Sequence, residues 1–188
     1  YPGNNISPLK TPDLIDPVKK VLEQRKDGGA GWSRAWKMGC WARLYDGERA
    51  LSIFKKNLKE QSLPQLFSLC FTAMQVDGSF GNSAAISEML IQSHEGFIQL
   101  LPALPNEWSD GMLKGICARG GFEISMDWKN KKVSKAQFLS QAGGLLRIKE
   151  TGKFSITCNG KSIKATKTKD GIIELKTLPG QTYILSLI

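Results

Sequence analysis

The sequence predicts an α+β protein in which helices come first and antiparallel strands follow. Up to about residue 95, apolar residues recur at the three- to four-residue spacing of amphipathic helices. Beyond that point, short runs of alternating apolar and polar residues are separated by Gly, Asn-Gly and Asp-Gly turns. Because many short strands joined by tight turns are typical of sandwiches, we expect the second half to form an antiparallel β-sandwich.

Four helices are expected in the first half. The first opens at Thr11-Pro12, where the missing N–H of proline costs little, and runs to about Arg25. The second is expected to begin at Ser33, a residue type favoured as an N-cap, and the third follows Asp46-Gly47. The fourth is expected to start near Asn82-Ser83.

The second half contains the expected strands. Asn159-Gly160 and Asp170-Gly171 have the composition of hairpin turns. The proline-containing stretch 101–105 is the expected connection between the two halves. Strands are expected at residues 98–101, 113–119, 122–128, 134–140, 145–149, 154–158, 172–176 and 183–187.

The charge of the chain is uneven. Residues 1–128 hold 14 basic and 14 acidic side chains, whereas residues 129–176 hold 12 basic and 3 acidic ones and carry the net charge of +9. A basic stretch can mark a nucleic-acid site. Here the lysines are spread among alternating apolar residues, and only Phe138 and Phe154 could stack on bases. We therefore expect a solvated outer sheet face and no nucleic-acid partner.

Neither a metal site nor a membrane segment is expected. The four cysteines lie 30, 47 and 41 positions apart without a Cys-x-x-Cys pair, and the single histidine, His94, is near none of them in sequence. Each cysteine has apolar neighbours and is expected to be buried as a small apolar side chain. No stretch approaches the roughly 18 consecutive apolar residues of a membrane span.

Two unusual connections are expected at one end of the helical half. Because successive helices joined by short loops alternate in direction, the connections that lead into the second and fourth helices share an end. The first, residues 26–32, is glycine-rich and ends in Trp32, and the second, residues 62–81, is long and too apolar for disorder. Trp32 could offer a flat face to a sugar ring, or it could anchor the start of its helix as a buried side chain.

The same segments resemble a known family. GWSRAW at residues 31–36, WARLYDG at 41–47 and QVDGSFG at 75–81 are similar to motifs in the late helices of glycoside hydrolase family 95 α-L-fucosidases, whose last motif reads Q-[IV]-D-G-N-F-G. They are followed by ISEML at 86–90, QSHEG at 92–96, LLPALP at 100–105 and ARGGFE at 118–123. The resemblance covers residues 1 to about 128, and the last 60 residues match only in general character.

This resemblance implies a fold and an activity. Residues 1–95 would be the C-terminal helices of an (α/α)6 catalytic barrel, and residues 96–188 a C-terminal β-sandwich domain. The implied reaction is the inverting hydrolysis of terminal α-linked L-fucose, or of the related L-galactose, without a cofactor. Inversion needs a general acid and an activated water on opposite faces of the sugar. The implied partner is a fucosylated oligosaccharide or a plant or host glycan, met outside the cytoplasm in the periplasm or after secretion.

The resemblance also implies roles for particular residues. In the family a glutamate is the general acid, and asparagine amides hold the water while the aspartate of the D-G-N-F-G motif makes the amide oxygen more basic. Asp77 matches that aspartate and is the expected catalytic residue; without the resemblance, a turn residue or a helix cap would be the simpler interpretation. Trp32 and Ser79 are the expected substrate-binding residues. Ser79 stands where the motif has Asn, and the segment before Gly31 lacks a histidine that many members carry, so both departures could change substrate contacts.

Other polar residues have simpler expected roles. Glu88 lies within the fourth helix and Glu95 at its far end, so neither is expected to replace the general acid. Arg34 is expected to be a surface charge at a helix start. His94 would lie about 18 Å from the Asp77 end of the helix and is expected to be a structural hydrogen-bonding residue.

The general acid and the asparagines lie upstream of the matched motifs in the family. We therefore expect this chain to be the C-terminal portion of a larger enzyme, to be inactive alone, and to pack against the remainder of the parent barrel. The alternative is a non-catalytic glycan-binding or structural subdomain. A glycan-binding module predicts exposed aromatic side chains on a sheet face, whereas Trp108 and Trp128 are the only tryptophans of the second half.

Overall fold

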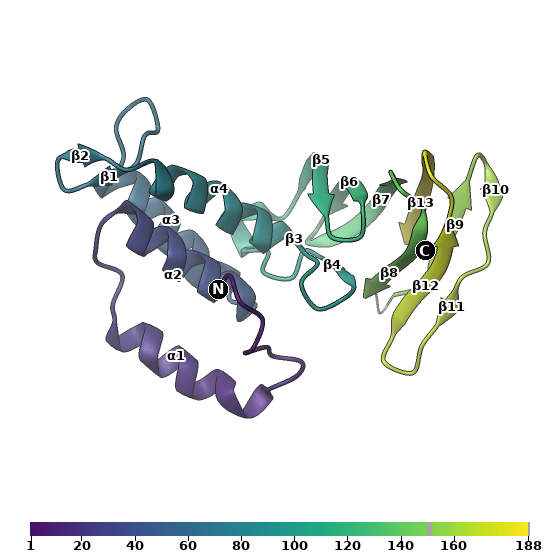
Figure 1. Ribbon diagram of the computed structural model, residues 1–188, viewed down its shortest axis with the longest axis horizontal. Coiled ribbons are helices and arrows are strands. Elements are labelled where there is room, and N and C mark those ends of the chain that lie inside the picture. The colour runs from purple at the N-terminus through teal and green to yellow at the C-terminus, as the bar shows by residue number, and fades with distance from the viewer. Residues whose placement is uncertain (150–151, 188) are drawn as a thin grey trace. The chain divides into compact units, whose positions relative to one another are not determined.

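The computed structural model describes residues 1–149 and 152–187, with helices in the N-terminal half and strands in the C-terminal half (Figure 1). The chain divides into two compact units, one formed by Tyr1–Leu90 with Pro102–Pro105 and the other by Ile91–Leu101 with the residues from Asn106 onward. The elements of the first unit are η1 (Pro12–Leu14), α1 (Ile15–Gln24), α2 (Gly31–Arg43), α3 (Gly47–Glu60), β1 (Leu69–Cys70), β2 (Ala73–Met74) and α4 (Val76–Leu90).

Helix α2 is the centre of the first unit because it packs against both α3 and α4. Its side chains are buried around most of its circumference, including those of Met38, Trp41 and Ala42. The start of α3 agrees with the sequence prediction, since the Asp46 carboxylate accepts a hydrogen bond from the Arg49 N–H at 2.9 Å. A side-chain acceptor at this position satisfies one of the unpaired N–H groups of a first helical turn.

Helix α4 begins at Val76, six residues before the predicted start. Its first two turns contain Gly78 and Gly81, which are unfavourable in an isolated helix by about 1 kcal/mol each. Both are buried against other elements. A Cβ at Gly78 would lie 2.2 Å from Ser68 Oγ and 2.9 Å from the carbonyl carbon of Gly31, and one at Gly81 would lie 2.8 Å from Ala35 Cβ. Close packing against α2 thus requires the glycines that made this segment look like a loop.

The predicted N-cap of α2 is also wrong. The helix begins at Gly31, with Ala30 at the N-cap position, and Ser33 lies inside the first turn. Gly31 is buried, and a Cβ there would lie 1.8 Å from Ser68 Oγ. The helix therefore starts where the backbone can approach Ser68, and not where the side chain best suited to capping occurs.

The second unit consists of two sheets. Its elements are β3 (Ile91–Gln92), β4 (Ile98–Leu100), η2 (Asn106–Trp108), β5 (Gly111–Ala118), β6 (Phe122–Lys129), β7 (Lys132–Ser140), β8 (Gly144–Lys149), β9 (Phe154–Cys158), β10 (Lys161–Ser162), β11 (Thr166–Lys167), β12 (Ile172–Thr177) and β13 (Gln181–Leu187). Within the described residues, one sheet has the order β10-β9-β13-β7-β6-β5 and the other the order β11-β12-β8-β4-β3. The pairs are antiparallel except for β4 and β8, which run parallel.

Each sheet buries one face, as the alternating pattern predicts. In the first sheet, Ile124 of β6 is paired with Phe138 of β7, and both are fully buried. In the second sheet, Ile148 of β8 is paired with Ile173 of β12, and both are likewise fully buried. The predicted turn at Asn159-Gly160 also occurs, and it joins β9 to β10. Both residues have positive φ, which a type I′ turn requires.

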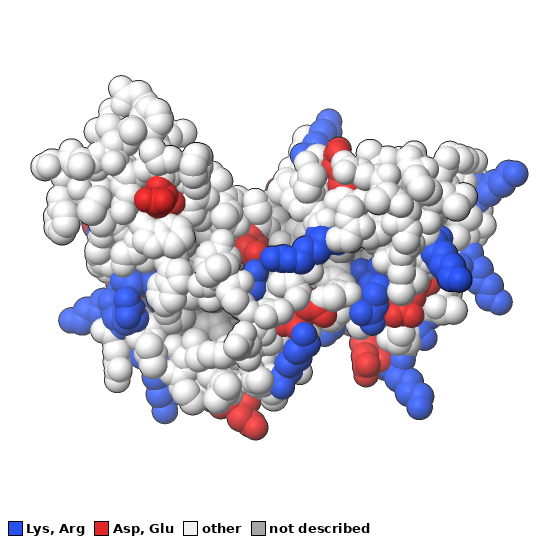
Figure 2. Space-filling model, in the orientation of Figure 1, with Lys and Arg blue, Asp and Glu red and all other residues white. Residues whose placement is uncertain are grey.

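The excess positive charge lies on the strands and connections of the second unit. Figure 2 shows its Lys and Arg side chains as separate projections on the visible face, with acidic side chains between them.

The cysteines differ in exposure, since Cys40 is buried whereas Cys117 is exposed, so the prediction that all four are buried is wrong. Among the described residues, no helix has the length and apolar character needed to cross a membrane.

The glycine contact between α2 and α4 yields a stability prediction. Gly78→Ala should destabilise the helical unit by about 1–3 kcal/mol, because the added Cβ meets the backbone of Gly31 and the Ser68 side chain. The measurement is the thermal midpoint of the circular dichroism signal at 222 nm, where 1 kcal/mol corresponds to roughly 4–8 °C for a unit of this size. Gly28→Ala is the matched control, since nothing lies within 4 Å of a Cβ there, and it should be neutral or stabilising. Equal midpoints for the two variants would contradict the packing account.

Candidate functional site

The two unusual connections meet at one end of the first unit, as the alternating helix directions predict. The first turns of α2 and α4 lie against each other at Gly31 and Gly78. Asn57 near the end of α3 is fully buried, and its Nδ2 donates to Asn82 Oδ1 of α4 at 2.9 Å. The hairpin of β1 and β2 lies beside the same end (Figure 1). Three helices and a hairpin therefore hold this rim of the helical unit.

Asp77 lies in the first turn of α4 with its side chain exposed. The backbone N–H groups of a first helical turn are without intrahelical partners, and the helix dipole favours a negative charge there. The fold thus presents an accessible carboxylate at the rim. Asp77 is on the helix itself, whereas the sequence prediction placed it in the preceding loop.

Trp32 lies in the first turn of α2 and is 41% exposed. One part of its indole packs on Gly81 of α4, since a Cβ there would lie 2.8 Å from a ring carbon. Gly81 follows Asp77 by four residues and so lies on the same face of α4, one turn further along. The rest of the indole lines an open hollow of about 390 Å³ together with Arg25, Ser33 and Trp36. Trp32 is therefore neither fully buried nor detached from the rim.

Ser79 is half-buried and has a bonding role inside the protein. Its Oγ accepts a hydrogen bond from the Ser68 N–H at 3.0 Å. This bond ties the strand-like segment before β1 to the first turn of α4. Since a hydroxyl can donate as well as accept, the Ser79 side chain retains one donor.

Gln75 is a residue of the rim that the sequence analysis did not single out. Its side-chain Oε1 accepts a hydrogen bond from the Trp32 N–H at 2.9 Å, across 43 positions of sequence. The sequence did not indicate this contact, because it predicts Ser33 as the N-cap, whereas the structure places Ala30 there and α2 makes no side-chain cap of its own. A helix that begins without a local cap needs an acceptor from elsewhere.

Arg34 is buried, so the prediction of a surface charge is wrong. Its guanidinium donates to the Lys56 carbonyl at 3.0 Å and to the Glu60 carboxylate at 2.6 Å, both in the last turns of α3. A cation near the C-terminal end of a helix is stabilising. The hydrogen bond from Arg34 also holds the pKa of Glu60 below its ordinary value.

Lys37 fixes the glycine-rich connection that leads into α2. Its buried ammonium donates to the carbonyls of Lys26 at 2.8 Å and Gly28 at 2.7 Å. Burial, followed by the nearby charge of Arg25, lowers the pKa of Lys37 from its ordinary value. The connection before Trp32 is thereby attached to α2 itself.

The other acidic candidates have structural partners. Glu88 forms a two-pronged ion pair with Arg43, with oxygen-to-nitrogen distances of 2.5 and 2.8 Å, so it holds α4 to α2.

His94 lies beyond the end of α4, which stops at Leu90, and belongs to the second unit. Its Nε2 is 3.4 Å from Glu95 Oε1, and both side chains are buried. The predicted position of His94 at the end of the fourth helix is therefore wrong.

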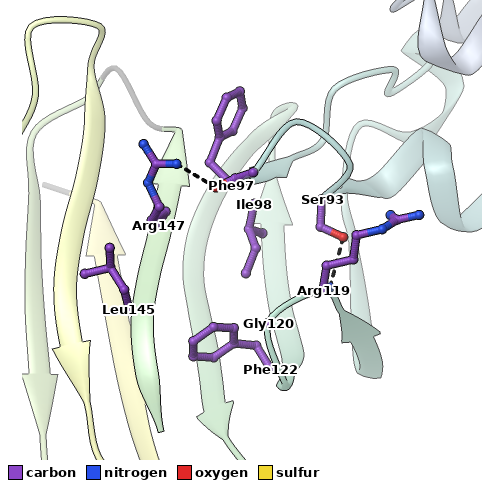
Figure 3. Close-up of a pocket in the computed structure, with 9 residues that line it drawn as sticks. Ser93, Phe97, Ile98, Arg119, Gly120, Phe122, Leu145 and Arg147 are labelled. Carbon is purple, nitrogen blue, oxygen red and sulfur yellow. Dashed lines mark hydrogen bonds between the residues drawn. The ribbon is translucent and has the colours of Figure 1, made fainter. Parts of the chain in front are cut away.

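The second unit contains a hollow of about 180 Å³ whose lining includes Ile98, Phe122, Leu145 and Arg147 (Figure 3). The Arg147 guanidinium donates to Glu174 at 2.8 Å and to the Gly96 carbonyl at 3.0 Å. The Arg119 guanidinium extends away from Ile98 and Phe122 in Figure 3. With apolar walls and its nearer arginine engaged, this hollow does not have the converging polar groups of a catalytic site. Over the described residues, no cluster of His, Cys, Asp and Glu is arranged to hold a metal ion.

Comparison with known proteins matches both halves of the chain to one family. Residues 1–90 match the glycosyl hydrolase family 95 catalytic domain, and residues 92–185 match the glycoside hydrolase family 95 C-terminal domain. Among solved structures, a family 39 glycoside hydrolase from the gut symbiont Bacteroides cellulosilyticus WH2 covers 47% of this chain and 18% of its own, at 13% identity and a TM-score of 0.33, a likeness too weak to bear on the fold.

Curated relatives carry fucosidase names. Alpha-L-fucosidase 2 of Arabidopsis thaliana is 39% identical over 139 residues, covering 68% of this chain and 16% of its own length. Probable alpha-fucosidase A of Aspergillus niger is 26% identical over 171 residues, covering 79% and 22%, and its counterpart in Aspergillus oryzae is 30% identical over 118 residues, covering 54% and 16%. The chain thus spans about a fifth of the length of these relatives. Through the two family matches, which together cover nearly all of its residues, the chain belongs to glycoside hydrolase family 95.

Proposed function

We propose that this chain is the C-terminal portion of an inverting glycoside hydrolase that releases terminal α-linked L-fucose, or L-galactose, from glycans. In this proposal residues 1–95 are the last helices of an (α/α)6 barrel, and residues 96–188 are a β-sandwich domain. The family membership and the fucosidase names of the relatives support it. So does the helix arrangement, since the first turns of α2 and α4 meet at one end, as alternate helices of an up-and-down series would.

The observation that carries the proposal is the neighbourhood of Asp77. An exposed carboxylate in the first turn of α4 lies one turn from the glycine on which the Trp32 indole packs. A carboxylate and a partly exposed aromatic face at one rim are what a sugar-cleaving site needs, since sugar rings present apolar faces and polar edges. The first turns of α2 and α4 also carry glycines where they meet. Because these residues have no side chains, the two helices can approach each other closely.

Asp77 would act through the water and not on the sugar itself. Inversion requires a water on the face opposite the leaving group, and an amide oxygen that holds this water is a weak base alone. A carboxylate that accepts the amide N–H bonds pushes electron density onto that oxygen. Asp77 takes this role, while the general-acid glutamate and the water-holding asparagines come from upstream residues. Trp32 and Ser79 contact the sugar, Ser79 through its remaining donor.

The proposed substrates are fucosylated oligosaccharides or plant or host glycans, met in the periplasm or after secretion. The upstream part of the barrel is the proposed partner of the helical unit. Large apolar side chains in the segment before and within the first turns of α4 support this, because several are strongly exposed: Leu66 by 68%, Phe71 by 85%, Met74 by 56% and Phe80 by 72%. Exposed apolar surface of this kind usually meets another protein surface.

The exposed apolar segment yields a prediction for the 188-residue chain. It should bind a hydrophobic dye or associate with itself, and it should not hydrolyse a fucoside. Phe71→Ser combined with Phe80→Ser should reduce dye fluorescence, whereas Leu178→Ser, a control at an equally exposed position (67%) in the second unit, should not. A monomer that binds no dye would count against a missing partner surface.

The second prediction concerns Asp77 in the complete enzyme. Asp77→Asn keeps the shape of the side chain but removes its charge, so kcat on 2′-fucosyllactose should fall about 10²- to 10⁴-fold, or roughly 3–5 kcal/mol of transition-state stabilisation. KM and the melting temperature should change little, because the change is nearly isosteric.

Asp16→Asn is the matched control for this measurement. Asp16 is also an exposed aspartate in the first turn of a helix, α1, so the same charge is lost from an equivalent helix position. Its kcat should remain within a few-fold of the wild type. If Asp77→Asn retains more than about a tenth of wild-type kcat, Asp77 is only a helix-start residue and the proposed mechanism is wrong.

A further inference from the structure

The N-terminus of α2 is capped by a side chain that belongs to a different segment of the chain. Ala30 stands at the N-cap and has no side-chain acceptor, and the Trp32 N–H donates instead to Gln75 Oε1 at 2.9 Å. An acceptor in a first helical turn is normally supplied by the residue just before it. Here the acceptor comes from the residue just before α4, two positions ahead of Asp77.

The backbone of Gln75 is itself held on both sides. Its N–H donates to the Ser68 carbonyl at 2.7 Å, and its carbonyl accepts from the Gly78 N–H at 3.1 Å. The second of these bonds belongs to the first turn of α4. Gln75 is therefore joined through its backbone to the helix that carries Asp77 and through its side chain to the helix that carries Trp32.

The glycines at this junction set the separation of the two helices. Gly31 and Gly78 let the two first turns touch, with no room for a side chain between them. Further along, the ion pair of Arg43 with Glu88 resists a shift of α2 along α4. A directional hydrogen bond between a fixed acceptor and a fixed N–H restricts that shift, because it weakens steeply as its angle departs from linear.

We propose that Gln75 is a positioning residue that sets the register of Asp77 against Trp32 by bonding to the N-terminus of α2. The proposal rests on the proposed function of Asp77 and Trp32 and adds a residue that acts through them. It explains why an amide precedes the aspartate by two positions in the segment 75–81. A long neutral acceptor reaches the neighbouring helix without placing a second negative charge beside Asp77.

Two substitutions separate the bond from the charge. Gln75→Met keeps the length of the side chain and removes the acceptor. Gln75→Glu keeps an acceptor of the same length and adds a negative charge. Asp46→Ala is the matched control, since it removes the cap of α3, a bond of the same length at 2.9 Å that touches neither Asp77 nor Trp32.

The test is steady-state kinetics of the complete enzyme on 2′-fucosyllactose across pH, with melting temperatures for every variant. Gln75→Met should lower kcat about 10- to 100-fold, the range that a small misplacement of reacting groups causes. Gln75→Glu, which keeps the acceptor, should recover most of this loss. Asp46→Ala should lower the melting temperature and leave kcat within about twofold of the wild type.

The outcomes discriminate between this proposal and the one on which it rests. If Asp77→Asn abolishes turnover while Gln75→Met keeps kcat within about twofold, Gln75 is only a cap and the positioning role is wrong. If Asp46→Ala loses as much kcat as Gln75→Met at a similar melting temperature, the effect is general destabilisation and the role is again wrong. If Asp77→Asn itself retains turnover, the proposed function has failed and not merely the register of the helices.

Discussion

The helical unit depends on the contact between the first turns of α2 and α4. Gly31 and Gly78 are buried against each other and against the Ser68 side chain, so neither position has room for a Cβ. Asn57 closes the same junction from α3 through its bond to Asn82, and the ion pair of Arg43 with Glu88 joins α2 and α4 further along. Because both helix N-termini end at this junction, their unpaired N–H groups and positive dipole ends are concentrated there. The position of Asp77 follows from that constraint.

Much of the fold could be predicted from sequence because its signals are local. The strand at residues 154–158 and the turn at Asn159-Gly160 agree with the structure, since alternation and positive φ are properties of neighbouring residues. Asp46 marked the start of α3 for the same reason. The features that were missed involve distant partners. Glycines at 78 and 81 indicate a loop by propensity, yet they are needed inside α4 because Ser68, Gly31 and Ala35 approach them. Arg34 reaches the end of α3, which its position in sequence does not reveal.

The candidate site divides in the same way. Asp77, Trp32 and Ser79 were identified by resemblance to a family motif, and the structure brings Asp77 and Trp32 to adjacent turns of one rim. Gln75 lies in the same motif but was not singled out, because its acceptor role depends on a helix start 43 residues away. The missing local cap at Ala30 became evident only from the structure, because the sequence predicts Ser33 as the N-cap.

The most direct test of the account is a crystal structure of the complete enzyme with a fucose-shaped iminosugar bound. The account predicts that the inhibitor lies at the rim formed by α2 and α4, and that the Asp77 carboxylate is roughly 3 Å from the amide nitrogen of an upstream asparagine whose oxygen holds a water below the sugar. The Gln75 side chain should still accept the Trp32 N–H in that complex. An inhibitor bound at a different surface, with Asp77 in contact only with solvent, would contradict the account.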